Sequence, residues 1–329
     1  MKLAIVILNW NGKKLLEQFL PPVIAHSKEA TVYVADNAST DDSVSYVKSE
    51  FPSVKIIQNK VNGGYSKGYN DTLKRIEADI FCLLNSDVEV AENWLTPIMD
   101  VFEKESNTAI IQPKILDFNK KDSFEYAGAG GGFIDKYGYP FCRGRIFNTI
   151  EKDLGQYNDT TEIFWASGAC LFIRSKIFNE LKGLDERFFA HMEEIDLCWR
   201  AKNMGYSIKY VGNSEIYHVG GATLKNTNPQ KTYLNFRNSL FALTKNAKGN
   251  LFELIMVRLI LDGIASLNFL FELRPTHVFA IIKAHFSFYY HFLSFYKERQ
   301  TIKHKIKHYQ TSSIVFDYFI SRKNKYKSL

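Results

Sequence analysis

The first half of the chain alternates short apolar runs with amphipathic segments, and this alternation restricts the possible fold more than any other feature. The apolar runs are LAIVIL, TVYVAD, SVKIIQ and DIFCLL, and segments of helical period separate them. Strands that alternate with helices in this way form a parallel sheet with helices on both faces. We therefore predict an α/β fold with a doubly wound, mostly parallel sheet flanked by helices.

Polar residues follow each apolar run, where a parallel sheet of this kind binds its ligands. They are Asn9 and Asn11 after the first run, Asp36 and Asn37 after the second, Asn62 and Gly63 after the third, and Asn85 and Asp87 after the fourth. Because the carboxyl ends of parallel strands share one edge, we expect these residues to line a single cleft.

The chain of 329 residues is long enough for one full α/β core and a smaller appended part. Residues 113–160, which include AGAGGGF, are typical of an inserted hairpin or loop, and we assign no chemistry to them. Strands end after about Lys231, and two long helical patterns follow, separated at Arg274-Pro275. We predict an α/β domain over residues 1–245 and a helical, aromatic and basic extension over 246–329.

The basic character of the chain belongs to its tail. Residues 297–329 contain nine Lys and Arg against two acidic residues, which equals the whole net charge of +7. A basic segment binds nucleic acid, binds anionic lipid, or is simply solvated. Nucleic acid is disfavoured because no recognised binding module is present.

The helical patterns before the tail favour lipid. Glu253, Arg258 and Asp262 interrupt the first pattern, so a membrane-spanning helix is disfavoured. Aromatic residues gather at 286–296, directly before the basic tail, as expected for amphipathic helices that lie on a membrane surface. The alternative is a helical pair that packs on the α/β domain or on a second subunit, and the oligomeric state stays open.

The cysteines and the first residues bear on the compartment. Cys82, Cys142, Cys170 and Cys198 have no close pairing, which indicates neither a zinc knuckle nor a disulfide framework and favours a reducing environment. The opening MKLAIVILNWNG is typical of a first strand and not of a signal peptide. We expect a cytoplasmic protein.

Six segments of the chain, taken in order, resemble a known family. VILNWNG, VADNASTDDS, NGGYSKGYN, LLNSDVEV, SGACLFIR and GLDERFFAHMEEIDLCWR are similar to the signature blocks of family 2 inverting glycosyltransferases of the GT-A fold, in particular bacterial rhamnosyltransferase-like members. The resemblance covers about residues 3 to 245. It implies a GT-A type sheet and an enzyme of polysaccharide biosynthesis at the inner face of the cytoplasmic membrane.

The reaction implied by the resemblance is transfer of a sugar from a nucleotide diphosphate donor, of dTDP-rhamnose or UDP-sugar type. The acceptor would be a hydroxyl of a glycan or of a lipid-linked sugar. The departing diphosphate is negatively charged, so such a site needs a divalent cation, Mg²⁺ or Mn²⁺, held by oxygen or imidazole ligands.

Asp87 is the first candidate ligand of that cation. It stands where the family has an Asp-x-Asp motif, and here Asn85 takes the first position. One carboxylate alone provides too few protein ligands for a cation, which predicts a second ligand. Similar enzymes place a metal-binding histidine where this chain has His218. The alternative for His218 is a hydrogen-bonded histidine at the end of a strand.

Three acidic residues, Glu193, Glu194 and Asp196, begin a predicted helix. In an arbitrary helix they would complement the helix dipole. Inverting transfer, however, needs one carboxylate to accept the acceptor proton, and a neighbouring carboxylate can raise its pKa. The family pattern maps this base onto Glu194, with Glu193 as the alternative, whereas Asp196 and Arg200 are spaced for an ion pair.

Further site residues follow from the same resemblance. Asp36 resembles the family carboxylate that binds the nucleobase or ribose, although it could also cap the next helix. Asn62, Gly63 and Lys67 lie in a loop that leads into a helix, a geometry suited to anion binding. Trp165 and Gly168 resemble the acceptor side of the cleft. A tryptophan at that position is as often a core residue.

Two other functions remain open. A nucleotidyltransferase-like sugar-nucleotide enzyme would need an activating basic motif in the first loop, where this chain has Asn-Trp-Asn-Gly. A non-catalytic sugar-binding protein would be favoured only if Asp87, Glu194 and His218 failed to converge.

Overall fold

The computed structural model describes residues 1–220, 228–302 and 304–329 of the chain. Within these residues a nine-stranded sheet has the order β11-β13-β6-β12-β4-β1-β2-β3, and β5 pairs with β13. Its strands are β1 (Leu3–Asn9), β2 (Thr31–Asp36), β3 (Lys55–Gln58), β4 (Ile80–Asn85), β5 (Val88–Val90), β6 (Thr108–Asp117), β11 (Thr160–Glu162), β12 (Cys170–Arg174) and β13 (Ser207–His218).

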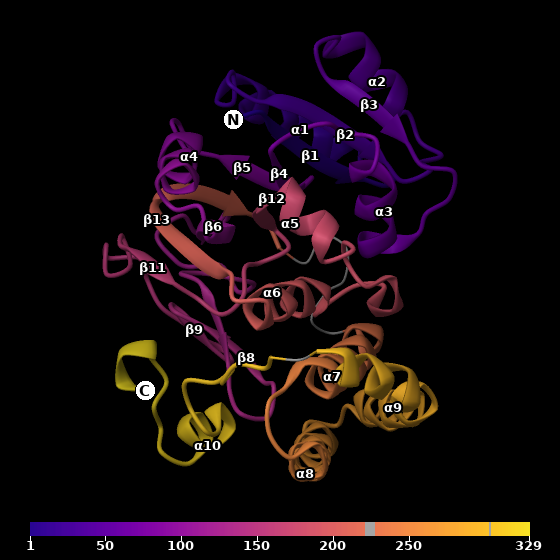
Figure 1. The fold of residues 1–329 in the computed structure, drawn as a ribbon, viewed down its shortest axis with the longest axis vertical. Helices are drawn as coiled ribbons and strands as arrows, with labels where there is room; N and C mark the ends of the chain where they lie inside the picture. The colour runs from indigo at the N-terminus through magenta and orange to yellow at the C-terminus, as the bar shows by residue number, and fades with distance from the viewer. Residues whose placement is uncertain (221–227, 303) are drawn as a thin grey trace.

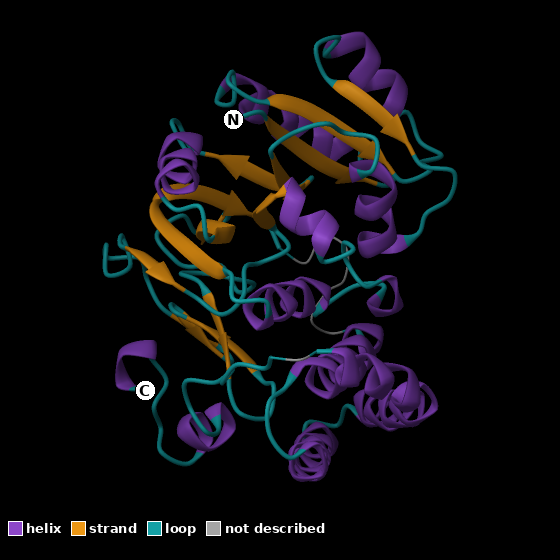
Figure 2. Ribbon diagram, in the orientation of Figure 1, coloured by secondary structure: helices purple, strands orange, loops and turns teal. Residues whose placement is uncertain are grey.

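Helices cover both faces of this sheet (Figures 1 and 2). The α-helices of the described residues, of which α8, α9 and α10 lie beyond this sheet (Figure 1), are α1 (Lys13–Ala25), α2 (Ser43–Glu50), α3 (Gly64–Leu73), α4 (Leu95–Lys104), α5 (Ser175–Glu180), α6 (Glu193–Asn203), α7 (Pro229–Asn246), α8 (Leu251–Phe271), α9 (Pro275–Thr301) and α10 (Ile314–Phe319). Alternate residues of β1 point to opposite faces, so Ile5 packs in one hydrophobic cluster and Val6 in the other.

The predicted parallel sheet is confirmed. β1 pairs in parallel with β2 and β4, β2 with β3, and β6 with β13, whereas β12 is antiparallel to β4 and β6. The register sets Asn9 opposite Asp36, and Leu8 opposite Asn85. The polar residues after the first, second and fourth apolar runs therefore meet at one edge.

The segment 113–160 is more ordered than the sequence predicts. Residues 113–117 are the end of β6, because the run TAIIQPKILD is buried and pairs with β13. Beyond them lies a four-stranded antiparallel sheet of β7 (Gly132–Ile134), β8 (Pro140–Cys142), β9 (Arg145–Ile146) and β10 (Thr149–Ile150). We refer to it as the small sheet.

The basic tail packs on the small sheet. Ile314 of α10 is buried with Phe141 and Ile146, and its amide donates to the Oδ2 of Asp135 at 3.0 Å. The tail is thus not a free solvated end, and its removal would uncover apolar residues of the small sheet. Lys303, one of its basic residues, lies outside the described residues.

The helices α7, α8 and α9 form the expected helical region, and the break at Arg274-Pro275 falls between α8 and α9. The rings of Phe241 in α7 and Phe295 in α9 stack with centroids 4.2 Å apart. The boundary predicted at residue 245 lies at the end of α7, and the division into two domains stays a prediction.

A buried charge cluster fixes α6 against α7. Asp196 accepts from the Nε of Arg200 at 2.7 Å, as the sequence predicts, and also from Lys245 at 3.2 Å and the Asn246 amide at 2.8 Å. Burial alone would raise the pKa of Asp196, but Arg200 and Lys245 lower it below its usual value. The carboxylate is therefore ionised and joins the two helices.

Replacing Asp196 by alanine should destabilise the fold by about 3 kcal/mol, because buried cations lose their partner. Chemical denaturation at neutral pH measures this loss. The matched control is Asp100→Ala, since Asp100 forms an exposed pair with Lys104 at 3.5 Å and such pairs contribute little. Equal stability of the two variants would contradict a structural role for the cluster.

Candidate active site at the carboxyl edge of the sheet

Asp87 and His218 come together at this edge because of strand pairing. Asp87 lies in the turn between β4 and β5, and the antiparallel pairing of β5 with β13 sets His218 opposite Val88. The Nε2 of His218 is 3.2 Å from the Oδ1 of Asp87. Both side chains are largely buried. Their predicted proximity is confirmed.

This pair fits a divalent cation. Two adjacent ligands of an octahedral cation, each about 2.1 Å from it, are about 3 Å apart, close to the separation of Asp87 and His218. The Asn85 amide nitrogen lies 3.5 Å from the same imidazole nitrogen. Among the described residues no group of three His, Cys, Asp or Glu side chains is arranged to hold a metal. A cation on this pair would thus keep positions open for phosphate oxygens and water.

Glu125 belongs to the same cluster, although the sequence analysis assigned it no role. Its Oε1 is 3.6 Å from the Nδ1 of His218, on the side of the ring away from Asp87. The amide of Glu125 donates to Ile115 in β6, which fixes the residue beside the sheet. A carboxylate beside the second nitrogen of a metal-binding histidine orients the ring. The sequence indicates this residue only as a lone acid among aromatic and small residues.

The two carboxylates also set the charge of His218. Burial would lower the pKa of His218, but Asp87 and Glu125 outweigh it and raise the pKa to about 10. The imidazole is therefore protonated at neutral pH when no cation is bound, and it must lose that proton to bind one.

We predict that binding of Mn²⁺, in the presence of a saturating nucleoside diphosphate, releases about one proton per cation near neutral pH. Calorimetric titrations in buffers of different ionisation enthalpy measure this number. The His218→Gln variant should bind Mn²⁺ more weakly and release no proton. Unchanged Mn²⁺ affinity in that variant would exclude His218 as a ligand.

Glu193 and Glu194 begin α6 directly after a strained segment. Phe189, His191 and Met192 all have positive φ angles, of 65°, 67° and 71°, a conformation that side chains with a Cβ rarely adopt. Asn238 of α7 holds this segment, because its amide nitrogen donates to the carbonyls of Phe188, Ala190 and His191 at 2.9, 2.9 and 2.7 Å. The α7 helix thus positions the two carboxylates.

Arg237, the neighbour of Asn238, supports the same segment. Its guanidinium donates to the carbonyls of Arg187 and Phe188, each at 3.2 Å. The same guanidinium also donates to the side chains of Asn238 at 2.8 Å and Tyr233 at 3.1 Å. Arg237 thus binds backbone carbonyls and neighbouring side chains.

Burial dominates the electrostatics of the two glutamates. Glu193 is only 4% exposed, and burial together with the charge of Glu194 raises its pKa well above the usual value. Burial also raises the pKa of Glu194, to about 7, against backbone N–H groups that lower it. The Oε2 atom of each has no hydrogen-bond partner among the described residues. A pKa near neutrality suits Glu194 for proton transfer.

Tyr65 connects these carboxylates to the cation pair. Its hydroxyl donates to the carbonyl of Gly168 at 2.8 Å, and its amide donates at 3.2 Å to the carbonyl of Phe189 in the segment before α6. The next residue, Ala169, accepts from the amide of Asn85 at 3.0 Å. The helix start and the cation pair are therefore joined by a short chain of contacts.

The candidate donor residues form one hydrogen-bonded set of loops. Asp36, which is fully buried, accepts from the Asn9 amide at 3.4 Å and from the backbone of Ser39 at 3.2 Å. Asn37 donates to Asn62 at 2.9 Å. Asp36 stabilises its own turn but does not cap the next helix, because the N-cap of α2 is Asp42. The donor-binding role of Asp36 stays a prediction.

Asn11 and the loop before α3 complete this set. Asn11, at φ 49°, accepts from the amide of Thr40 at 2.7 Å. Gly64, at φ 74°, packs closely on Phe189, since an added Cβ would lie 2.9 Å from its ring. The anion-binding role of this loop stays a prediction. Lys67 forms an ion pair with Asp71 at 2.8 Å, so a phosphate would have to compete with that carboxylate.

The structure does not support Trp165 as an acceptor-binding wall. The indole is 4% exposed, donates to the carbonyl of Phe133 at 2.8 Å and packs on the backbone of Gly132. Its ring is therefore part of the core and presents no open face to a sugar. Gly168, in contrast, lies at the site, where its carbonyl binds Tyr65.

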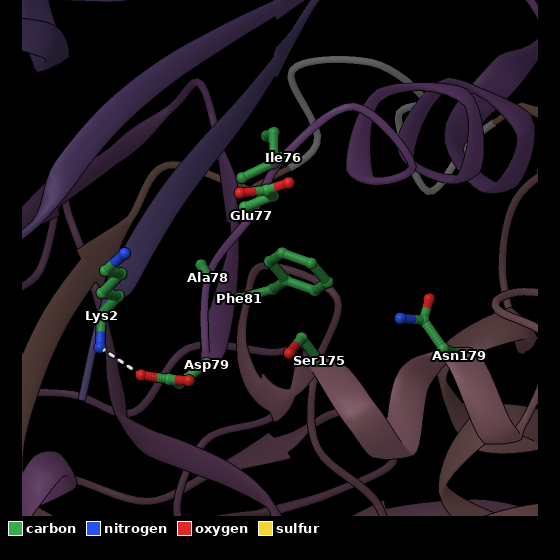
Figure 3. A pocket seen from close by; sticks show the side chains of 8 residues that line it. All are labelled: Lys2, Ile76, Glu77, Ala78, Asp79, Phe81, Ser175 and Asn179. Atoms are coloured by element: carbon green, nitrogen blue, oxygen red, sulfur yellow. Dashed lines mark hydrogen bonds between the residues drawn. The ribbon is translucent and has the colours of Figure 1, made fainter.

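A separate hollow lies away from these residues, at the amino end of β4 (Figure 3). Lys2, Asp79 and Ser175 are among the residues around it, and the amide of Lys2 donates to Asp79 at 2.6 Å. It contains neither member of the cation pair and neither glutamate. The carboxyl edge is thus the candidate active site.

The fold is that of glycosyltransferases with bound nucleotide sugars. The chain superimposes on GalNAc-T7 with UDP, GalNAc and Mn²⁺ at a TM-score of 0.58 and 16% identity, over 75% of this chain and 48% of that chain. It superimposes on the mannosyltransferase PcManGT from Pyrobaculum calidifontis in complex with GDP-Man and Mn²⁺ at a TM-score of 0.56 and 11% identity, over 88% of this chain and 87% of that chain. The architecture is the GT-A fold, and the prediction is confirmed.

The family follows from sequence. Residues 4–182, more than half of the chain, match the family model described as Glycosyl transferase family 2. The chain belongs to this family and is a glycosyltransferase of the hexosyltransferase type, as predicted.

Two curated relatives are named as sugar transferases. The N-acetylglucosaminyl-diphospho-decaprenol L-rhamnosyltransferase of Mycobacterium tuberculosis is 26% identical over 235 residues, which cover 66% of this chain and 75% of the relative. The low-salt glycan biosynthesis hexosyltransferase Agl10 of Haloferax volcanii is 24% identical over 250 residues, which cover 73% of this chain and 75% of the relative.

Proposed function

We propose that this enzyme transfers a sugar, with inversion, from a nucleotide diphosphate donor to an acceptor hydroxyl in cell-surface polysaccharide biosynthesis. A donor of the dTDP-rhamnose or UDP-sugar type fits best, because one relative is named as a rhamnosyltransferase and a neighbouring structure holds UDP. The observation that carries the proposal is the Asp87–His218 pair, joined through Gly168 and Tyr65 to a carboxylate whose pKa is raised to about 7.

The reaction would be a single displacement. The Glu194 carboxylate accepts the proton of the acceptor hydroxyl while the oxygen attacks the anomeric carbon of the donor. The bond from that carbon to the diphosphate breaks on the opposite face, and the electron pair leaves with the diphosphate. A Mg²⁺ or Mn²⁺ ion held by Asp87 and His218 would neutralise the charge of the diphosphate.

Glu193 would assist as the neighbour of the base. Burial and the charge of Glu194 raise its pKa well above the usual value, which favours the protonated form and limits the negative charge beside the base. With its pKa near 7, Glu194 is both substantially ionised and able to hold a proton at that pH.

The acceptor and the location are inferred from different observations. The mycobacterial relative is named for a lipid-linked sugar, N-acetylglucosaminyl-diphospho-decaprenol. We infer a lipid-linked or glycan acceptor and peripheral placement on the inner face of the cytoplasmic membrane. All four cysteines are free and buried, which suits a reducing compartment.

A screen of the purified enzyme against dTDP-, UDP- and GDP-sugars with Mg²⁺ or Mn²⁺ tests the function, with nucleotide diphosphate release as the readout. Release from one sugar nucleotide that depends on the cation is the expected result. Asp87 and His218 converge, and the approach of Glu194 to this pair stays a prediction that bears on the alternative of a non-catalytic sugar-binding protein.

The Glu194→Gln variant should keep donor binding and lose at least about a hundredfold in kcat, because an amide cannot accept the proton. Glu193→Gln is the matched control and should retain most of the turnover, since a protonated carboxyl and an amide are similar in shape. Normal turnover in Glu194→Gln together with loss of turnover in Glu193→Gln would assign the general base to Glu193.

The pH dependence follows from the pKa of Glu194, which is about 7. A general base is active when deprotonated, so kcat/KM should fall about tenfold per pH unit below that value. Initial rates at a fixed, saturating cation concentration measure the profile. A rate that stays constant well below neutral pH would contradict the assignment.

A further inference from the structure

The helices α8 and α9 present long apolar stripes to the outside. On α8 these are Met256, Ile260, Ile264, Leu267 and Phe271, and on α9 they are Phe279, Ile282, Phe286, Tyr290 and Leu293. Their exposed fractions range from 43% to 86%. We call these ten residues the outer face. Exposed apolar side chains in this number, spaced along one stripe of each helix, are typical of an interaction site.

The opposite side of α8 is polar and bound to the protein. Arg258 and Asp262 are buried and pair at 2.7 Å, and Asp262 also accepts from the hydroxyl of Tyr139 at 2.7 Å. His285 of α9 lies 3.1 Å from the other oxygen of Asp262. Arg258 donates to the carbonyl of Tyr137 at 3.0 Å. The helix is therefore fixed to the small sheet and to α9 by its charged side.

This anchoring decides how α8 can meet a membrane. By length and composition α8 is able to span a bilayer, and only 17% of its apolar window is buried. Spanning would detach Arg258 and Asp262 from Tyr139 and place two charged groups in hydrocarbon, which is costly. Lying along the surface keeps the cluster intact and still buries the outer face.

The charges beside the outer face favour an anionic surface over a second copy of the chain. Lys283 lies next to Ile282 on the exposed side of α9, whereas the nearest acids, Glu253 and Glu272, are paired with Lys136 and Arg274. A two-fold interface formed by this face would bring like charges together without acids to match them. Anionic lipid headgroups would instead attract the positive charge beside the outer face.

A third helix adds to the same end of the molecule. The helix α10 lies with α8 at the end opposite α2 (Figure 1). Phe316, Phe319 and Ile320 of this segment are exposed, and basic residues of the tail follow them. The aromatic and basic character predicted for the extension is thus gathered at one end of the fold.

The start of α9, just after the α8–α9 turn, contacts the first turn of α7, the helix whose Asn238 holds the segment before the two glutamates. At the start of α9, the Nδ1 of His277 is 2.7 Å from the hydroxyl of Thr232 in α7. The preceding residue, Lys231, interacts electrostatically with Glu125, and Glu125 is beside His218. Phe271, at the other side of the turn, is 86% exposed.

We propose that the outer face lies in the headgroup region of an anionic bilayer, with both helices parallel to its plane. The α8–α9 turn then faces the route by which an acceptor on a lipid presents its sugar to Glu194 without leaving the membrane. This inference rests on the lipid-linked acceptor of the proposed function. It also specifies a peripheral contact in place of a spanning helix.

Flotation of the full chain with phosphatidylcholine vesicles, with and without phosphatidylglycerol, tests the inference. The full chain should float with the anionic vesicles and be released by alkaline carbonate. The Phe286→Glu and Ile264→Glu variants should each lower vesicle binding by about tenfold or more, because an exposed apolar side chain that enters the headgroup region is replaced by a charge. Both positions are exposed, so the substitutions leave the core untouched.

Leu154→Glu is the matched control, since Leu154 is 84% exposed but lies outside the outer face; its vesicle binding should not change. Unchanged binding in Phe286→Glu and Ile264→Glu would overturn the inference, as would retention of the chain after carbonate. A soluble dimer that Phe286→Glu dissociates, with no vesicle binding, would assign the face to a second copy. Cation-dependent donor hydrolysis, measured on every variant, separates these outcomes from failure of the proposed function.

Discussion

The pairing of β13 with its neighbours is the constraint on which the candidate active site depends. β13 runs parallel to β6, shifts register between Val211 and Glu215, and then pairs with β5. Buried Lys114 of β6 binds Glu215 at 2.9 Å and Asp153 at 2.8 Å at this shift. The shift lets a strand from late in the chain reach the turn after β4, and His218 meets Asp87 there.

The second requirement is the position of the two glutamates, which depends on the C-terminal helices. The segment before α6 has three residues with positive φ, and Asn238 of α7 holds it through three backbone carbonyls. α7 in turn packs against α9. The helices beyond the family match at residue 182 therefore shape the active site as well as the proposed membrane face. A change in α9 has a physical route to the candidate catalytic carboxylates through α7.

The sequence predicted those features that depend on local pattern. Alternating apolar runs predicted the parallel sheet, and the order of the motifs predicted that Asp87 and His218 would meet. It missed features that depend on tertiary contact. Glu125 reaches His218 only because its segment pairs beside β6, and no motif marks it. Trp165 carries an indole, a side chain that often lines sugar-binding sites, but Gly132 leaves room for its ring in the core. The tail is basic in sequence, yet Ile314 attaches it to the small sheet.

We propose that Asp87 and His218 hold the cation that binds the donor diphosphate. Electron–nuclear double resonance of Mn²⁺ bound to the enzyme with a nucleoside diphosphate detects the ligand nuclei of the metal. We expect a directly coordinated histidine nitrogen, whose coupling changes when histidine is labelled with ¹⁵N and disappears in His218→Gln, together with coupling to phosphorus. A spectrum with phosphorus coupling and no histidine nitrogen would contradict the proposal.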